Sequence, residues 1–245
     1  MTSARGTVIA VFARLDSKRL PGKALTDLAG RPLLGRVLDR LRAATASEPL
    51  RGTPIVLATT DRPADDPIAA FGAAEGVSVF RGDCEDVAGR CLACADAQGA
   101  GRVVRISGDS PFIDAGVLRA VIAGATGAGA PDLVTNVFPR TYPPGVSVES
   151  IATAALRRML DETADPQDRE HVTRHIYANP DRFRIVNVAA PDDRYAGVTL
   201  TVDTPEDLDK ATWIAARLGP AAVTADLDTV VALARQWPHG KEAAA

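Results

Sequence analysis

The sequence predicts an α/β protein built on a doubly wound, mostly parallel, Rossmann-like sheet with an inserted α+β arm. Short β-branched runs alternate along the chain with longer stretches in which apolar residues recur at helical spacing. The strand runs are continuously apolar, as is typical of parallel strands buried on both faces. A length of 245 residues with 46% hydrophobic and 24% charged residues fits one large domain. We therefore expect a single domain over residues 1–237 and a flexible tail over residues 238–245.

Five expected strands alternate with four expected helices in the first part of the chain. The strands are Val8–Phe12, Ile55–Ala58, Val77–Phe80, Val103–Ile106 and Leu133–Val134. The helices are Leu33–Ala44, Asp65–Ala74, Asp86–Ala97 and Asp114–Gly124. Because parallel strands are joined by right-handed crossover helices, this succession predicts a sheet covered on both faces. In such a sheet the ligand site lies beyond the carboxyl ends of the strands.

The pattern changes between residues 138 and 191, and we interpret this segment as an inserted substrate-binding or dimerisation subdomain. A turn-rich loop opens it, followed by a strand at Val146–Ile151 and helices at Thr153–Glu162 and Gln167–Ala178. Strands return at Ile185–Val188 and Thr199–Val202. Thr204 as N-cap, Pro205 in the first turn and Asp207 three residues after the cap predict a helix start. The inserted arm leads us to expect a homodimer.

Composition excludes several classes of protein. The hydrophobic content is too high for a disordered chain, and no apolar run is long enough to span a membrane. A net charge of -3 gives no overall attraction to nucleic acid. The run Val8–Ala13 is too short for a secretion signal and fits a strand better. The three cysteines form an odd set that does not suggest a disulfide scaffold, so we expect a cytoplasmic protein.

The loop after the first expected strand is the most informative segment. Residues 13–23 place Arg14, Lys18, Arg19 and Lys23 where a doubly wound sheet presents its ligand site. Only four of the 28 basic residues are lysines, and two of these four lie in this loop. A compact cluster of cations suits a triphosphate, although a solvated basic loop is an equal alternative. The spacing fits neither a Walker motif nor a dinucleotide fingerprint.

Two aspartates follow expected strands at their carboxyl ends. Asp109 comes after Val103–Ile106, and Asp203 comes after Thr199–Val202, 94 residues further along the chain. Mg²⁺ is commonly held by one or two carboxylates together with substrate phosphates. A turn acid and a capping acid are the structural alternatives. We predict that Asp109 and Asp203 converge on one metal ion.

These three segments together resemble the sugar-acid cytidylyltransferases, which activate KDO and sialic-type acids as CMP conjugates. The likeness is greatest to the spore-coat polysaccharide branch. The matching segments, in family order, are Ala13-Arg14 with Leu20-Pro21-Gly22-Lys23, then Gly108-Asp109-Ser110-Pro111, then Val202-Asp203-Thr204-Pro205-Glu206-Asp207-Leu208. The resemblance implies a nucleotidyltransferase domain of the GT-A type. It also implies that Arg14 and Lys23 bind the triphosphate and act in catalysis with the metal ligands Asp109 and Asp203. Asp16 departs from the family, which has a small or glycine-containing pair at Leu15-Asp16.

The resemblance also implies a nucleotide pocket and an acceptor site. The pocket residues would be Ala13, Arg14, Ser17, Arg19, Lys23, Thr60, Asp86, Arg90 and Gly108. The acceptor contacts would be Arg140, Glu149, Arg169 and His171. Surface pairing is the alternative for Arg90, and a helix start is the alternative for Asp86. His171 and His175 are expected on one helical face, where packing beside a subunit interface is the alternative. Ser147 stands where this branch commonly has an acid, so the identity of the sugar is not transferred.

The resulting hypothesis is a Mg²⁺-dependent enzyme that transfers CMP from CTP to a hydroxyl of a nonulosonic or KDO-like sugar acid and releases pyrophosphate. CTP and the sugar acid are the expected partners, with no nucleic acid and no membrane. One alternative keeps the chemistry but uses UTP, or a phosphonate or other acid as acceptor. Another alternative is a catalytically inactive nucleotide-binding sensor. No general base is assigned.

Overall fold

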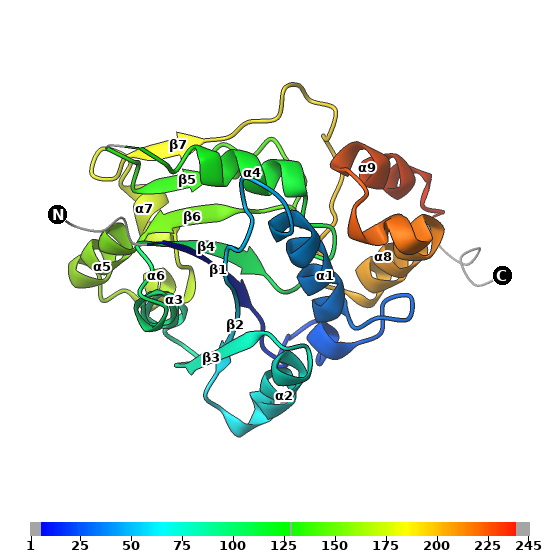
Figure 1. Cartoon of the computed structure of the whole chain (residues 1–245), viewed down its shortest axis with the longest axis horizontal. Helices are drawn as coiled ribbons and strands as arrows, with labels where there is room; N and C mark the ends of the chain where they lie inside the picture. Colours follow the sequence, from blue (N-terminus) through cyan, green and yellow to red (C-terminus); the bar gives the residue numbers. More distant parts are fainter. Residues whose placement is uncertain (1–5, 128, 239–245) are drawn as a thin grey trace.

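A single seven-stranded sheet organises the computed structural model, which describes residues 6–127 and 129–238 (Figure 1). Its order is β3-β2-β1-β4-β6-β5-β7. The strands are β1 (Thr7–Phe12), β2 (Ile55–Thr60), β3 (Ser78–Gly82), β4 (Arg102–Ser107), β5 (Leu133–Thr135), β6 (Glu149–Ala152) and β7 (Ile185–Asn187). All neighbouring strands are parallel except β6, which runs antiparallel to β4 and β5. The predicted mostly parallel α/β fold is confirmed. Residues 239–245 of the predicted tail lie outside the described residues.

Helices cover both faces of the sheet. They are α1 (Leu33–Thr45), α2 (Asp66–Ala74), α3 (Val87–Ala97), α4 (Ala115–Ala123), α5 (Thr153–Glu162), α6 (Pro166–Glu170), α7 (Arg174–Ala178), α8 (Pro205–Leu218) and α9 (Leu227–Gln236). Figure 1 shows α3, α5, α6 and α7 on one side, and α1, α8 and α9 on the other. Alternating residues of β1 supply the two cores, because Ile9 and Val11 pack on the α1 side, whereas Val8 and Ala10 pack on the α3 side.

The sheet has a topological switch point between β1 and β4. The chain runs outward from β1 to β2 and β3, and then crosses to β4 on the other side of β1. The loops after β1 and β4 therefore leave in opposite directions and open a crevice at the carboxyl edge. Gly108 lies at the edge of this crevice, and its N–H donates to the carbonyl of Phe12 at 2.8 Å. A Cβ at position 108 would lie 2.9 Å from that carbonyl oxygen, so the close approach of the two strand ends requires glycine.

The segment from residue 138 to 191 is continuous with the sheet. It supplies β6 and β7, and it covers one face with α5, α6 and α7. Gly145, at a φ of 96°, lies against the chain that leads to Asp203, where an added Cβ would be 2.4 Å from the carbonyl carbon of Leu200. This tight contact fixes the position of one side of the crevice. A role for the segment in dimerisation stays a prediction.

Two expected elements take a different form in the structure. The helix expected at Gln167–Ala178 is broken into α6 and α7, and His171 leaves the helical conformation at φ −106° and ψ 87°. The break allows the hydroxyl of Thr173 to turn inward and donate to Glu149 at 2.6 Å. The prediction that His171 and His175 share one helical face is therefore wrong.

The strand expected at Thr199–Val202 is also absent from the sheet. This segment makes isolated backbone hydrogen bonds instead, from Leu200 N to Pro144 O at 2.7 Å and from Val202 N to Asp109 O at 3.0 Å. It therefore links two loops of the crevice. Within the described ranges, no helix combines the length and the apolar character needed to cross a membrane.

Candidate active site

A cavity of about 500 Å³ opens at the switch point, beyond the carboxyl ends of β1 and β4. Many of the residues singled out from the sequence line it together. These are Ala13, Arg14, Ser17, Arg19, Lys23, Arg90, Gly108, Asp109, His171 and Asp203. The lining also includes Lys18 of the predicted basic loop, and Arg105, Ser107 and Glu170, which were not assigned to a site from the sequence. The structure thus joins the basic loop, both aspartates and the turn between α6 and α7 in one site.

Lys23 bridges the two aspartates at the centre of this cavity. Its Nζ donates to Asp109 Oδ2 at 3.0 Å, to Asp203 Oδ1 at 2.8 Å and to the carbonyl of Val202 at 2.8 Å. Arg19 contacts the other oxygen of Asp203 at 2.9 Å. Only 12% of the Lys23 side chain is exposed, so this ammonium group is held between the two carboxylates. The predicted convergence of Asp109 and Asp203 is therefore present in the geometry, with a cation between them.

Local structure fixes each aspartate in place. The backbone hydrogen bond from Val202 to Asp109 joins the two segments directly. Asp203 precedes the capping box of α8, in which the Thr204 side chain accepts from Asp207 N and the Asp207 side chain accepts from the N–H groups of Thr204 and Asp203. The helix start predicted from the sequence therefore also holds the second carboxylate at the crevice.

The aspartate pair fits a divalent cation completed by substrate. No cluster of three or more His, Cys, Asp or Glu residues suited to a metal occurs in the parts of the chain that the structure describes. Mg²⁺ keeps several non-protein ligands and is commonly bound by one or two carboxylates plus phosphates. Because Asp109 and Asp203 already direct oxygens at the single nitrogen of Lys23, they have the spacing to share one cation. The metal would require Lys23 to move aside.

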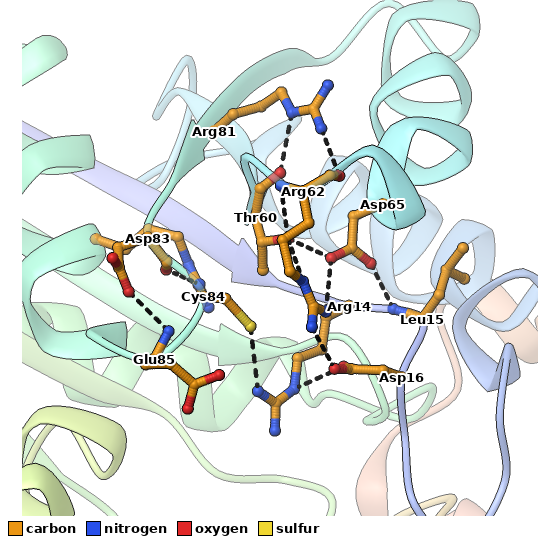
Figure 2. Close-up of polar contacts among 11 residues, drawn as sticks. Arg14, Leu15, Asp16, Thr60, Arg62, Asp65, Arg81, Asp83, Cys84 and Glu85 are labelled. Carbon is orange, nitrogen blue, oxygen red and sulfur yellow. Dashed lines mark hydrogen bonds and ion pairs between the residues drawn. The ribbon is translucent and has the colours of Figure 1, made fainter.

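A polar network beside the cavity holds the loop that follows β1 (Figure 2). Asp16 lies between Arg14 Nε at 3.2 Å and Arg62 Nη1 at 2.7 Å, so the unexpected carboxylate is neutralised within the protein. Its contact with Arg62 holds the pKa of Asp16 below the usual range. Asp65 accepts from Leu15 N at 2.7 Å, from the Thr60 hydroxyl and from Arg62. Asp65 was expected only as a helix start, yet it anchors the loop.

Asp65→Asn is expected to lower the free energy of unfolding at pH 7 by about 2 kcal/mol, because a fully buried hydrogen-bonded carboxylate loses its charge. Burial alone would raise the pKa of Asp65, but Thr60, Leu15 and Arg62 lower it. A carboxyl group with a lowered folded-state pKa stabilises the protein above its ordinary pKa of about 3.9, and the benefit is lost as the pH falls. Denaturation at pH 7, 5 and 3 should therefore show that the variant and the wild type differ less in free energy of unfolding as the pH falls.

The neighbouring Asp66→Asn is the control, because Asp66 is exposed and forms a surface ion pair with Arg81. It should change stability by less than about 0.5 kcal/mol. Equal effects of the two substitutions at pH 7 would contradict the anchoring role of Asp65.

Five predicted site residues lie outside the cavity lining. Thr60 is buried against Asp65, and Arg140 donates to Ser147 on an exposed loop. Asp86 caps α3 by accepting from Gly89 N, and it pairs with Arg169 at 2.9 Å beside a neighbouring hollow. Glu149 is buried behind the wall of the cavity. Asp86 thus caps the start of α3, which was the alternative to its predicted place in the nucleotide pocket.

Arg90 and His171 reach the cavity from two elements of the same face. Arg90 on α3 lies near the ring of Phe12, donates to the carbonyl of Asp83, and is 4% exposed. This burial lowers the pKa of Arg90. His171 is exposed in the turn between α6 and α7. Arg90 is therefore part of a fixed wall, whereas His171 lies at the open rim.

The chain matches a known family over most of its length. A family model described as Cytidylyltransferase matches residues 8–220. The chain belongs to the cytidylyltransferase family. This confirms the family resemblance and identifies the protein as a nucleotidyltransferase.

Individual members support the same assignment. The cytidylyltransferase chain is 30% identical over 225 residues to the spore coat polysaccharide biosynthesis protein SpsF of Bacillus subtilis, covering 90% of this chain and 92% of that protein. It is 31% identical over 172 residues to a 3-deoxy-manno-octulosonate cytidylyltransferase of Rhodospirillum centenum, covering 68% of this chain and 56% of that protein. A solved cytidylyltransferase from Leptospira borgpetersenii superposes with a TM-score of 0.86 at 27% identity, covering 95% of each chain.

Proposed function

We propose that this cytidylyltransferase transfers CMP from CTP to a hydroxyl of a small anionic sugar acid and releases pyrophosphate. The observation that carries this proposal is the convergence of Lys23, Asp109 and Asp203 beside the basic loop in one cavity. Nucleotidyl transfer places negative charge on the attacking and leaving oxygens, and this arrangement supplies charges of both signs to bind phosphates and a metal. The curated relative from Rhodospirillum centenum, whose name specifies 3-deoxy-manno-octulosonate, supports a sugar acid as the acceptor class.

The basic loop is the proposed triphosphate site. Arg14, Lys18, Arg19 and Lys23 line the same cavity from one loop, so they can neutralise the β- and γ-phosphates that depart as pyrophosphate. Lys23 has two roles in this site. It holds both carboxylates before substrate binds, and it can turn toward a phosphate oxygen when substrate is bound. Arg14 and Arg62 contact the two oxygens of Asp16 and balance its charge, which weakens its repulsion of the phosphates.

Asp109 and Asp203 are the proposed ligands of Mg²⁺. When bound, the metal supplies charge stabilisation to the reacting phosphate oxygens. The protein contributes fixed carboxylates, a loop that orients the triphosphate, and a cavity that holds the acceptor hydroxyl in line with the α-phosphorus. The hydroxyl oxygen attacks that phosphorus and gives up its proton to water, the bond to the bridging oxygen breaks, and pyrophosphate leaves with the electron pair of that bond.

Pyrophosphate release across a matrix of nucleotides and acceptors tests this proposal. The nucleotides are CTP, UTP, ATP and GTP, and the acceptors are KDO, N-acetylneuraminate, a phosphonate acid and a neutral hexose. We expect the highest kcat/KM for CTP with a sugar acid, and loss of turnover when EDTA removes the metal. Preference for UTP or for the phosphonate would replace the corresponding part of the proposal. CTP binding without turnover across the whole matrix would support a nucleotide-binding sensor instead.

A further inference from the structure

Arg105 is a charged residue of β4 in a position where its neighbours are apolar. Val103 on the same face of the strand packs in the core beneath α3 and α5, whereas Arg105 lies nearer the carboxyl end and lines the cavity. Its Cζ is 6.0 Å from the centroid of the Phe12 ring. Its side chain is 29% exposed, so the guanidinium is both held by the wall and open to the cavity.

A buried carboxylate anchors Arg105 from behind. Glu149 is the direct partner of Arg105 across the antiparallel β4–β6 pair, and its Oε2 accepts from Arg105 Nη1 at 2.6 Å. Its Oε1 accepts from Thr173 at 2.6 Å and from Tyr177 at 2.7 Å. Burial would raise the pKa of Glu149, but Arg105 and these two hydroxyl groups lower it, so Glu149 stays ionised. The anchor therefore fixes the direction of the guanidinium group.

The anchor occupies only one nitrogen of the guanidinium group. Within residues 6–127 and 129–238, Nη1 makes the only hydrogen bond of this group, and Nε is buried without a partner. Nε has no surface open to the cavity, so Nη2 is the nitrogen that can donate to a ligand there. Because guanidinium groups donate strongly to carboxylates, the unbonded Nη2 favours an anionic acceptor group supplied by a ligand.

The charge balance at this end of the cavity indicates an anion. Arg90 and Arg105 both lie against Phe12, and Glu149 neutralises one of these two positive charges. Glu170 also lines the cavity, but it is exposed at the rim. The triphosphate already has its own cations in the loop after β1. One positive charge is thus left for a singly charged group of the second substrate.

We propose that Arg105 binds the carboxylate of the acceptor and sets the specificity for acids, with Glu149, Thr173 and Tyr177 as positioning residues. This inference rests on the proposed function, since it names the contact through which the same site selects a sugar acid. The sequence predicted that Glu149 contacts the substrate directly, whereas in this proposal Glu149 positions Arg105.

Arg105→Lys tests the proposal, because lysine keeps the positive charge beside Glu149 but lacks a second nitrogen that can donate into the cavity. We expect KM for the sugar acid to rise about 10- to 100-fold, while KM for CTP changes less than about twofold. The matched control is Arg102→Lys. Arg102 lies on the same strand and also bonds to β6, through Ser150, but at the end away from the cavity. It should leave both KM values unchanged.

A second measurement compares the sugar acid with its carboxamide. Wild type should prefer the acid about 10- to 100-fold in KM, and Arg105→Lys should remove most of this preference. Tyr177→Phe, which loosens Glu149 and leaves Arg105 intact, should raise KM for the acid about threefold at unchanged kcat. If Arg105→Lys does not fold, the acid-to-carboxamide ratios of wild type and Tyr177→Phe decide the question.

The outcomes separate this inference from the proposed function. Turnover of a sugar acid with an unchanged acid-to-carboxamide ratio in the variants, or a rise in KM for CTP instead, would overturn the role of Arg105 and leave the proposed function standing. Turnover by wild type with neutral acceptors alone would overturn both.

Discussion

Asp203→Asn and Asp109→Asn are each expected to lower kcat/KM for CMP transfer by about a thousandfold. Each substitution removes one of the two carboxylates that converge on Lys23, and with it half of the protein's contribution to the proposed metal site. Asparagine keeps the size of the side chain, so the loss should appear in turnover far more than in the melting temperature. Pyrophosphate release at saturating Mg²⁺ measures the effect. The two single variants and the double variant should be similarly impaired, because the carboxylates act as a unit.

Asp132→Asn is the matched control for these variants. Asp132 has an exposed fraction of 26%, close to the 22% of Asp109, and like Asp109 it is paired with a cationic side chain, in this case Arg158 at 3.1 Å. It lies just before β5, outside the cavity lining. Its substitution should leave kcat/KM within about twofold of wild type. An activity loss of less than threefold in Asp109→Asn and Asp203→Asn would contradict the proposed metal site.

Lys23→Met is expected to raise KM for CTP about 100-fold, because the triphosphate loses a charge-assisted hydrogen bond at its centre. The same variant should bind Mg²⁺ more tightly than wild type in the absence of CTP. Lys23 occupies the space between the two carboxylates, and its removal leaves two like charges that a metal ion can relieve. Titration calorimetry with Mg²⁺ measures this gain, and a rise in melting temperature on adding Mg²⁺ gives a second readout.

Lys210→Met is the control for Lys23→Met, because it also removes a lysine that is mostly buried. Lys210 is 15% exposed and contacts Asp207 rather than Asp109 or Asp203. We expect unchanged affinity for Mg²⁺ and for CTP. Weaker Mg²⁺ binding by Lys23→Met than by wild type would show that Lys23 does not compete with the metal.

The parts of the site that could be predicted lie at strand ends. Asp109 and the loop containing Lys23 follow apolar runs whose burial the sequence makes plain, and the topology of a parallel sheet brings such ends to one edge. The start of α8 could be predicted because its capping box is local. It consists of contacts between Thr204 and Asp207, which lie three residues apart in the sequence.

The parts that could not be predicted depend on contacts between distant segments. An arginine within a strand normally indicates a solvent-facing position, and only the pairing of Arg105 with Glu149 on β6 makes its partial burial favourable. The break between α6 and α7 similarly depends on Thr173 reaching Glu149. Extended backbone at residues 199–202 has the alternation of a strand, but it bonds to Pro144 and Asp109 rather than to a strand neighbour.

The hydrogen bond between Val202 and Asp109 joins two parts of the site that are synthesised far apart in time. The ribosome delivers the basic loop early, the first aspartate later and the second only when most of the chain has emerged. A nascent chain can therefore hold the groups for the nucleotide well before it holds both carboxylates. The proposed site is complete only when the late segment docks beside β4, so it forms together with the closure of the native fold.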